Sequence, residues 1–217
     1  MINYNTLHVM PSIIMGVSGP SGSGKSLFSK GICSNFGAKK EAVTLSEDGY
    51  YKNHPELSFE ERGVRNYDHP DAFEHDLLIK HINMLKSGEP INAPLYDYVS
   101  HLRKEETVHI LPCPVIILEG ILLLSDEKIR NLIDIKIYMD TSLDICLSRR
   151  IYRDIVERER DVTSIITQYN NYTRPMYFKF IEPSRKYADV IVPKGGKNEI
   201  AVDIIQVKID KLIRDKE

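Results

Sequence analysis

The stretch Gly19-Pro20-Ser21-Gly22-Ser23-Gly24-Lys25-Ser26 decides how the rest of this chain is interpreted. It fits the phosphate-loop pattern G-x-x-x-x-G-K-[ST], in which glycine-rich backbone turns successive N–H groups inward around phosphate oxygens. A helix that begins near Lys25 would point the positive end of its dipole at the same place. The pattern predicts that Lys25 reaches the terminal phosphates of a nucleotide and that the Ser26 hydroxyl holds Mg²⁺.

The residues on either side of the loop strengthen this interpretation. Ile13 to Val17 form an apolar run of strand length directly before it, and Leu27 to Ile32 are spaced as a helix directly after it. A flexible Gly/Ser linker is the alternative. It is disfavoured because linkers are not framed by a buried strand and an apolar-spaced helix.

Length and charge limit what the chain can be. Its 217 residues suffice for one α/β domain with room for a small insertion, so we expect residues 1–217 to form a single domain. The 29 basic and 31 acidic side chains give a net charge of −2, so no global field attracts nucleic acid or a membrane surface. We therefore expect neither as a partner.

The cysteines and the chain start indicate the compartment. Cys33, Cys113 and Cys146 are far apart and form no C-x-x-C pair, which argues against disulfides and against a zinc site. The start lacks a basic region followed by an apolar core, and no apolar run approaches the roughly 18 residues of a membrane helix. We expect a soluble cytoplasmic protein.

Strands alternate with helices along the chain, which predicts a parallel sheet flanked by helices. An insertion at about 90–112 has two strand-like runs joined by a charged stretch, which predicts a β-hairpin beside the core. In the helix expected over 143–158, we expect Leu143, Leu147, Ile151 and Ile155 to form the core stripe. Further strands are expected at 42–46, 114–120, 135–140 and 189–192, and further helices at 73–85 and from Lys197 to about Arg214.

Three carboxylates follow apolar strands: Asp48, Glu119 and Asp140. Polar residues at the ends of parallel strands lie at the edge where open α/β sheets bind ligands. Asp48 and Glu119 are placed for Mg²⁺ and for an incoming nucleophile, so we assign the metal to Ser26, Asp48 and Glu119 and the general base to Asp48. Each residue has a simpler interpretation as a surface acid, and for Asp140 that is the favoured one.

Basic residues gather at 149–160, where the chain has Arg149, Arg150, Arg153, Arg158 and Arg160. In a helix the first three span an arc of about 100° on one flank of the apolar stripe. Such a flank can close over phosphates and neutralise charge on a transferring phosphoryl group, the catalytic role we assign to Arg153. The alternative is a solvated face paired with Asp154, Glu157 and Glu159.

A third group is aromatic and polar. Aromatic faces stack on a nucleobase, and a carboxylate such as Asp68 suits a ribose diol. The residue pattern leaves open whether these side chains bind a ligand or pack in the core. The group consists of Tyr50, Tyr51, Tyr67, Asp68, Tyr96 and His101.

Together these segments resemble the uridine kinase family, also called uridine-cytidine kinases. The similarity covers nearly everything from Ile13 to Asn198. It is carried by GPSGSGKS from Gly19, EDGYYK from Glu47, NYDHPDAF from Asn66, PLYDYVSHLRKEET from Pro94, VIILEGILLL from Val115, DICLSRRIYRD from Asp144, QYNNYTRPMY from Gln168 and PSRKYADVIVPKGGKN from Pro183.

The resemblance implies a P-loop kinase that phosphorylates the 5′-hydroxyl of uridine or cytidine in pyrimidine salvage, with ATP or GTP as donor and Mg²⁺ as cofactor. It implies that Asp48 is the catalytic base, that Asp68 and Arg150 hold the ribose, and that Tyr96 and His101 contact the pyrimidine. Tyr51 and Gln168 align with the nucleoside pocket, and Tyr67 and Arg160 are assigned to it as well. The donor is assigned to Gly19 through Leu27 together with Arg158 and Arg160.

The resemblance also implies an arginine-rich lid at about 149–165, a turn at Lys194-Gly195-Gly196 near the donor base, a homotetramer, and feedback inhibition by CTP or UTP. One departure concerns the lid. Where the family usually has E-R-G-R, this chain has Glu157-Arg158-Glu159-Arg160. A charged helix former in place of glycine puts the closing motion and the local register of the lid in doubt.

Two alternatives to this function remain. One is a P-loop kinase of another small alcohol, such as phosphoribulokinase or pantothenate kinase, which Tyr96 and His101 disfavour because those acceptors bring no pyrimidine. The other is a nucleotide-dependent switch that binds without turnover. It is disfavoured because the chain has no N-K-x-D guanine signature and has a base-like acid, Asp48, after its second strand.

Overall fold

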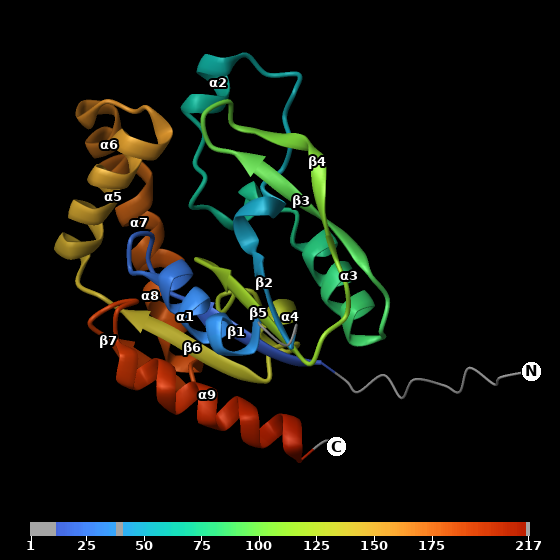
Figure 1. The fold of residues 1–217 in the computed structure, drawn as a ribbon. Helices are drawn as coiled ribbons and strands as arrows, with labels where there is room; N and C mark the ends of the chain where they lie inside the picture. Colours follow the sequence, from blue (N-terminus) through green and yellow to red (C-terminus); the bar gives the residue numbers. More distant parts are fainter. Residues whose placement is uncertain (1–11, 38–40, 216–217) are drawn as a thin grey trace, which may run out of the picture.

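A computed structural model describes residues 12–37 and 41–215, and its central feature is a parallel sheet. The strand order is β2-β5-β1-β6-β7, and every pairing within the sheet is parallel (Figure 1). This confirms the predicted sheet, with small differences at the strand ends. The strands are β1 (Ile13–Ser18), β2 (Ala42–Ser46), β5 (Val115–Gly120), β6 (Ile135–Asp140) and β7 (Val190–Pro193).

Helices cover both faces of the sheet, which is why its central strands are largely apolar. On one face, α1 (Lys25–Gly37) and α9 (Glu199–Arg214) pack against alternate strand residues such as Met15. On the other face, α3 (His75–Lys86) and α4 (Glu127–Arg130) pack against the intervening ones such as Ile14. The alternation follows from the two-residue period of a strand.

The predicted hairpin is present as β3 (Ile91–Asp97) and β4 (Leu102–Ile110), paired antiparallel. Its register shifts between Pro94 and Tyr96, where the proline has no N–H to donate to the ladder. The hairpin and the short helix α2 (Phe59–Gly63) stand on one side of the phosphate loop, and α5 (Leu143–Arg158) with α6 (Val162–Gln168) stand on the other (Figure 1).

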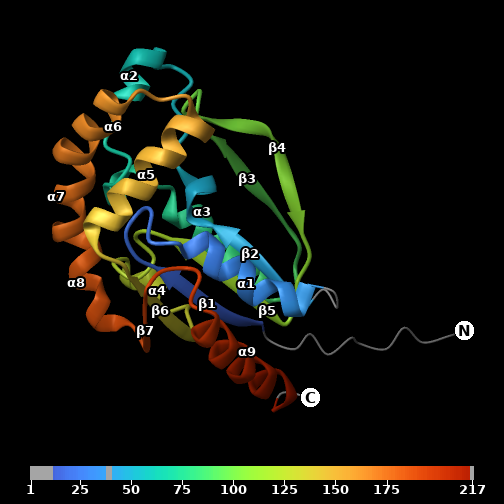
Figure 2. The same cartoon turned by 60° about the vertical axis from the view of Figure 1, so that its left-hand side comes forward.

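A helical run that the sequence did not predict follows α5. After α6 it alternates between π-helical turns (Tyr169–Thr173 and Tyr177–Ile181) and the short helices α7 (Arg174–Met176) and α8 (Glu182–Ser184), and it descends beside the sheet to β7 (Figure 2). Pro175 and Pro183 lie in α7 and α8. A proline clashes with the carbonyl four residues earlier, and in both cases that carbonyl belongs to a wider π turn, which relieves the clash.

The predicted core stripe of α5 is wrong. Its buried residues are Cys146, Arg150 and Asp154, whereas Ile155 is 42 % exposed. These three lie at i, i+4 and i+8, so the helix does bury one face, but that face is mostly polar. The reason is that it packs against the polar residues of a cavity described below.

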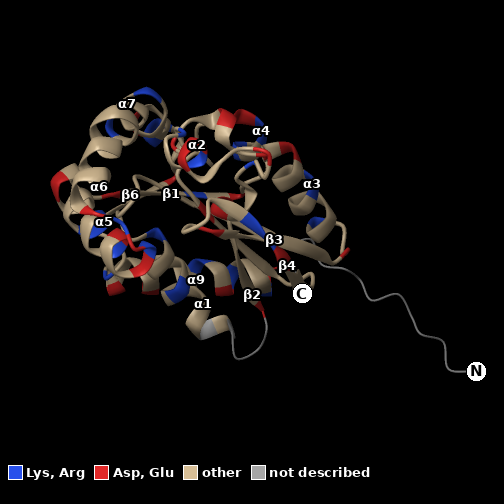
Figure 3. Cartoon of the chain, turned by 90° about the horizontal axis from the view of Figure 1, so that it is seen from above, with Lys and Arg blue, Asp and Glu red and all other residues tan. Residues whose placement is uncertain are grey.

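The surface carries both signs of charge on its helices (Figure 3). Cys33, Cys113 and Cys146 are free thiols, in agreement with the prediction of no disulfide. Within residues 12–37 and 41–215, none of the helices has the length and apolar character needed to cross a bilayer.

Candidate functional site

The backbone of the loop between β1 and α1 lies close to the backbone of two other segments. Gly22 and Gly24 have φ of 82° and 98°, a region that favours glycine. A Cβ on Gly24 would lie 2.5 Å from the backbone nitrogen of Gly196, and one on Gly22 would lie 2.4 Å from the Cys146 carbonyl oxygen. The loop is thus seated against the segments that follow β6 and β7.

Lys25 opens α1 and turns back over the loop. Its Nζ donates hydrogen bonds to the carbonyl oxygens of Gly19 at 3.0 Å and Pro20 at 2.9 Å. Burial lowers the pKa of Lys25, and the nearby carboxylates of Asp48 and Glu119 oppose that shift. A cation held this way beside two carboxylates is ready to exchange carbonyl partners for phosphate oxygens.

Strand register brings the predicted acids to the loop. Glu119 of β5 pairs with Val17 of β1 on one side and with Ser46 of β2 on the other, and Asp48 follows two residues after Ser46. These acids therefore share an edge of the sheet with the phosphate loop. A cavity, here called the loop cavity, is lined there by Lys25, Ser26, Leu27, Asp48, Glu119, Arg149 and Arg153, among others.

The predicted metal ligands fit a hard cation. Ser26, Asp48 and Glu119 all line the loop cavity, and Oε2 of Glu119 is buried without a hydrogen-bond partner. Burial raises the pKa of Glu119, against the influence of Ser26 and Lys25. In the described part of the chain, no cluster of three or more His, Cys, Asp or Glu side chains is arranged for a metal. Mg²⁺ takes few protein ligands and completes its shell with water and phosphate oxygens, and hydroxyl and carboxylate oxygens such as those of Ser26, Asp48 and Glu119 are ligands of the kind it prefers.

Asp48 lies at the junction of two cavities. It lines the loop cavity and also a second one, the aromatic cavity, between the β3–β4 hairpin and α5. Arg153 likewise lines both. All residues that the sequence assigned to the acceptor line the aromatic cavity: Asp48, Tyr51, Tyr67, Asp68, Tyr96, His101, Arg150, Arg160 and Gln168.

The aromatic cavity takes its name from its ring contacts. Tyr51 stacks on Phe73 with ring centroids 4.3 Å apart, and Tyr67 stacks on His101 at 5.0 Å. His101 has a φ of 57° at the hairpin turn. Burial lowers the pKa of His101, and Arg160 and Arg158 lower it further. The imidazole is therefore neutral at physiological pH, with one nitrogen to donate and one to accept a hydrogen bond.

The helical run after α5 supplies the opposite wall of this cavity. Asp68 is 4 % exposed and accepts a hydrogen bond from the Thr173 hydroxyl at 2.9 Å. Arg150 is 6 % exposed and donates to Oε1 of Gln168 at 2.8 Å. Arg160 donates to the same oxygen at 2.6 Å. Asp68 and Arg150, which the resemblance assigns to the ribose, are thus both buried and both line the aromatic cavity.

Asp154 is the common partner of four arginines. It is fully buried, and its carboxylate accepts two hydrogen bonds from Arg153, at 2.9 and 2.7 Å. The guanidinium groups of Arg150, Arg158 and Arg160 approach it to 3.7, 3.6 and 3.5 Å. Arg150, Arg153, Arg158 and Arg160 are therefore not a solvated face, whereas Arg149 is exposed. The four are assembled around one buried counter-ion.

The sequence missed Tyr98 as a site residue. Its hydroxyl donates to Oδ2 of Asp48 at 2.8 Å, and Arg158 lies over its ring at 3.8 Å. Tyr98 lies in the hairpin turn directly after β3, two residues beyond Tyr96, and this i, i+2 spacing of aromatic residues was visible in the sequence. Asp154 was noted only as a surface partner, although its four-residue spacing from Arg150 and Arg158 pointed to shared contacts. Thr173 had no sequence signal.

Other predicted residues lie apart from this arrangement or on its border. Asp140 pairs with Arg185 at 2.9 Å and lines neither cavity, as a surface acid would. Tyr50 is fully buried, and its hydroxyl bonds to His81 at 2.8 Å, so it belongs to the core. Arg158 and Arg160 line the aromatic cavity rather than the loop cavity.

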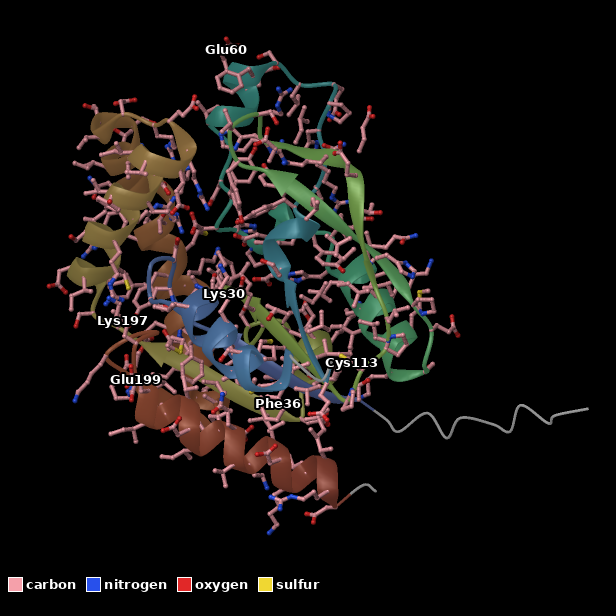
Figure 4. The ribbon with its side chains drawn as sticks, viewed as in Figure 1. Lys30, Phe36, Glu60, Cys113, Lys197 and Glu199 are labelled. Atoms are coloured by element: carbon pink, nitrogen blue, oxygen red, sulfur yellow. The ribbon has the colours of Figure 1, made fainter. Side chains whose placement is uncertain are left out.

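A groove between α1 and α9 adjoins the loop cavity at Leu27. Gly196 also lines it, which places the predicted glycine turn beside the loop. Lys30 of α1 and Lys197 and Glu199 at the start of α9 are further lining residues (Figure 4). A Cβ on Gly195 would lie 2.7 Å from Nη1 of Arg149, so this turn also borders the arginine flank.

Comparisons with known proteins agree with the geometry. The profile described as Phosphoribulokinase / Uridine kinase family matches residues 14–201. A protein of Pectobacterium atrosepticum named uridine kinase is 52 % identical over 92 % of this chain and 95 % of its own length. A second, from Yersinia enterocolitica, is 50 % identical over the same shares. A putative fructose transport system kinase from a Silicibacter species shares the fold, with a TM-score of 0.67 at 21 % identity over 87 % of this chain and 93 % of that one.

Proposed function

The chain belongs to the phosphoribulokinase/uridine kinase family, and from that premise we propose that it is a nucleoside kinase. It transfers the γ-phosphate of ATP or GTP to the 5′-hydroxyl of uridine or cytidine, giving UMP or CMP in pyrimidine salvage. The observation that carries the proposal is the position of Asp48, which lines both a phosphate-loop cavity and an aromatic, polar cavity. A transfer reaction needs its donor and acceptor to meet at one place.

The loop cavity takes the donor triphosphate. The free backbone N–H groups of the loop, the start of α1 and Lys25 supply positive charge there. Leu27 and the groove beside it are the place for the donor base, as the Gly195-Gly196 turn suggests. When Mg²⁺ is bound at Ser26, Asp48 and Glu119, it neutralises charge on the phosphates.

The aromatic cavity takes the nucleoside. Asp68 and Arg150 bind the ribose hydroxyls, with Gln168 orienting the guanidinium of Arg150. Tyr51, Tyr67 and Tyr96 offer ring faces to the base. The neutral His101 reads the base edge, because it can both donate and accept.

Asp48 accepts the proton of the 5′-hydroxyl as that oxygen attacks phosphorus. Tyr98 donates to Oδ2 of Asp48, and the remaining lone pairs of the carboxylate are left for the substrate hydroxyl and for Mg²⁺. Arg153, which lines both cavities, neutralises the charge that builds on the transferring phosphoryl group. Arg158 and Arg160, which line the aromatic cavity beside it, belong to the same arginine-rich lid. Phosphoryl transfer asks little covalent chemistry of the protein, so positioning and charge neutralisation account for most of the catalysis.

Several finer assignments belong to the same proposal. The chain is a single domain that works in the cytoplasm as a homotetramer, and CTP or UTP inhibits it by occupying donor and acceptor positions together. Sedimentation tests the tetramer, and inhibition by CTP or UTP, competed with added uridine and ATP, tests the regulation.

The test of the function is a panel of nucleosides crossed with ATP and GTP, read as ADP or GDP release. We expect release that depends on uridine or cytidine. Release that is no faster with any nucleoside than without contradicts the proposal and favours a nucleotide-binding switch. Release stimulated instead by another small alcohol, such as ribulose 5-phosphate or pantothenate, favours a kinase of that acceptor.

A further inference from the structure

A buried polar chain lies beside the turn that carries Asp48, outside both cavities. Nε2 of His75 is 3.0 Å from Oε1 of Glu47, and Nδ1 of His75 is 2.9 Å from Oδ2 of Asp126. Glu47 is the residue directly before Asp48. The side chain of Glu47 is fully buried and that of His75 is 11 % exposed. None of these three residues has a part in the mechanism above.

Glu47 is fixed at both oxygens. Its Oε2 accepts a hydrogen bond from the backbone N–H of Leu122 at 3.0 Å, two residues after the end of β5. A Cβ on Gly120 would lie 2.1 Å from that same oxygen, so only glycine leaves room for the carboxylate there. The turn of residues 47–50 is therefore tied to the end of the strand that carries Glu119.

His75 connects this turn to two other parts of the site. Its other partner, Asp126, caps α4 by accepting from the backbone N–H groups of Lys128 and Ile129. The His75 ring also stacks on Phe73 at 5.3 Å, and Phe73 in turn stacks on Tyr51 of the aromatic cavity. A shift of His75 would therefore displace both the turn of residues 47–50 and, through Phe73, the ring of Tyr51 in the aromatic cavity.

We propose that Glu47 and His75 are positioning residues for Asp48, and that their hydrogen bond holds the turn of residues 47–50 in register with β5. The proposal rests on the role of Asp48 given under the proposed function. In this proposal, loss of the Glu47–His75 contact lowers kcat, whereas loss of the His75–Asp126 contact lowers only the stability of the protein. The two contacts use different nitrogens of one ring, so they can be removed separately.

Two amide substitutions make that separation. The nitrogen of a glutamine side chain lies near the position of histidine Nε2, and that of asparagine lies near Nδ1. His75→Gln therefore keeps a donor toward Glu47, and His75→Asn keeps a donor toward Asp126. Asp126→Asn leaves Glu47 and His75 in place and retains a good helix cap. Asp76→Asn is the matched control, because Asp76 is an exposed acid on the same helix as His75 and its ion pair, with Lys128 at 3.9 Å, lies outside the chain of Glu47, His75 and Asp126.

The experiment measures uridine-dependent ADP release and the melting temperature of each variant, with assays at a temperature where all are folded. We expect His75→Asn to lower kcat about tenfold with KM for uridine within about twofold, since displacing a reacting group costs rate rather than affinity. His75→Gln and Asp126→Asn should keep kcat within about threefold while melting earlier, and Asp76→Asn should change neither quantity. If His75→Asn does not fold, Glu47→Asp, which shortens the carboxylate arm, replaces it with the same expected loss of kcat.

Equal kcat in His75→Asn and His75→Gln overturns the proposal, whether both match wild type or both are reduced. A loss in Asp126→Asn as large as that in His75→Asn also overturns it, because the network would then be a stabilising ion cluster only. These outcomes are distinct from failure of the proposed function. If the proposed function failed, the wild-type protein itself would show no nucleoside-dependent ADP release.

Discussion

Glu159 occupies a backbone conformation that glycine would adopt more easily, and Glu159→Gly should stabilise the protein. Glu159 ends α5 with φ 55° and ψ 33°, the left-handed region, and its side chain is exposed. The family pattern has glycine at this position, and the structure retains the glycine-like conformation with glutamate in place. The next residue, Arg160, still donates its N–H to the Asp154 carbonyl at 3.1 Å. Glutamate at this position therefore adopts a strained conformation at the end of α5.

The magnitude follows from two opposing effects. A left-handed conformation costs a residue with a Cβ roughly 1–2 kcal/mol. Glycine offsets roughly 0.5–1 kcal/mol of that gain, because it loses more conformational entropy on folding than a residue with a Cβ. The net gain is about 0.5–1 kcal/mol, which in a protein of this size raises the melting temperature by about 1–4 °C.

The assay is urea unfolding and thermal melting of wild type, Glu159→Gly and Glu159→Ala. Alanine removes the same negative charge and keeps the Cβ, so it should melt at or slightly below the wild-type temperature. Equal stabilisation by alanine and glycine would assign the effect to charge. No stabilisation by glycine would refute the backbone reasoning altogether.

Three further predictions concern the hydrogen bonds of the site. Tyr98→Phe removes the 2.8 Å hydrogen bond to Asp48 and keeps the ring under Arg158. Steady-state kinetics should show kcat lower by about tenfold at nearly unchanged stability, and an unchanged kcat would show that Tyr98 does not assist Asp48 as general base. Asp154→Asn leaves four guanidinium groups around a neutral amide and should lower the unfolding free energy by about 3 kcal/mol in urea titrations, and wild-type stability would contradict the counter-ion role. Burial alone would lower the pKa of His75, but hydrogen bonds to Asp126 and Glu47 outweigh it and raise that pKa to about 9 from 6.5. The protonated form is therefore favoured by folding. Protonation of His75 should contribute on the order of 3 kcal/mol to the free energy of unfolding. That contribution should be complete below pH 6.5 and should disappear as pH rises through 9, whereas His75→Gln should lack this pH dependence in the same urea titrations.

The sheet and the loop cavity were predictable because they depend on local signals. Strands such as β5 are buried on both faces, so their apolar runs stand out in the sequence, and the loop pattern marks where β1 ends. Once the strands are parallel, the acids at 48 and 119 must lie at one edge. The hairpin was predictable for a similar reason, since β3 and β4 carry strand-like runs on either side of a turn.

The face of α5 and the helical run after it were not predictable from periodicity. A helix that faces a polar cavity buries Arg150 and Asp154 most deeply and leaves Leu143, Leu147 and Ile151 half-buried and Ile155 exposed, so the deepest face is not the expected apolar stripe. The π turns shift the helical period twice between 169 and 181, so no regular pattern survives to be recognised. The contact between Thr173 and Asp68 spans 105 positions and depends on that run. The single domain, the tetramer and the inhibition by CTP or UTP stay predictions.

The position of Asp48 between the two cavities is the central claim, and Asp48→Asn tests it most directly. Two quantities are needed from the variant: its affinity for ATP by calorimetry and its uridine-dependent ADP release. The account predicts ATP binding within a few-fold of wild type, together with a turnover at least about 10²-fold lower, the contribution expected of a general base. An Asp48→Asn protein that phosphorylates uridine at close to the wild-type kcat would contradict it.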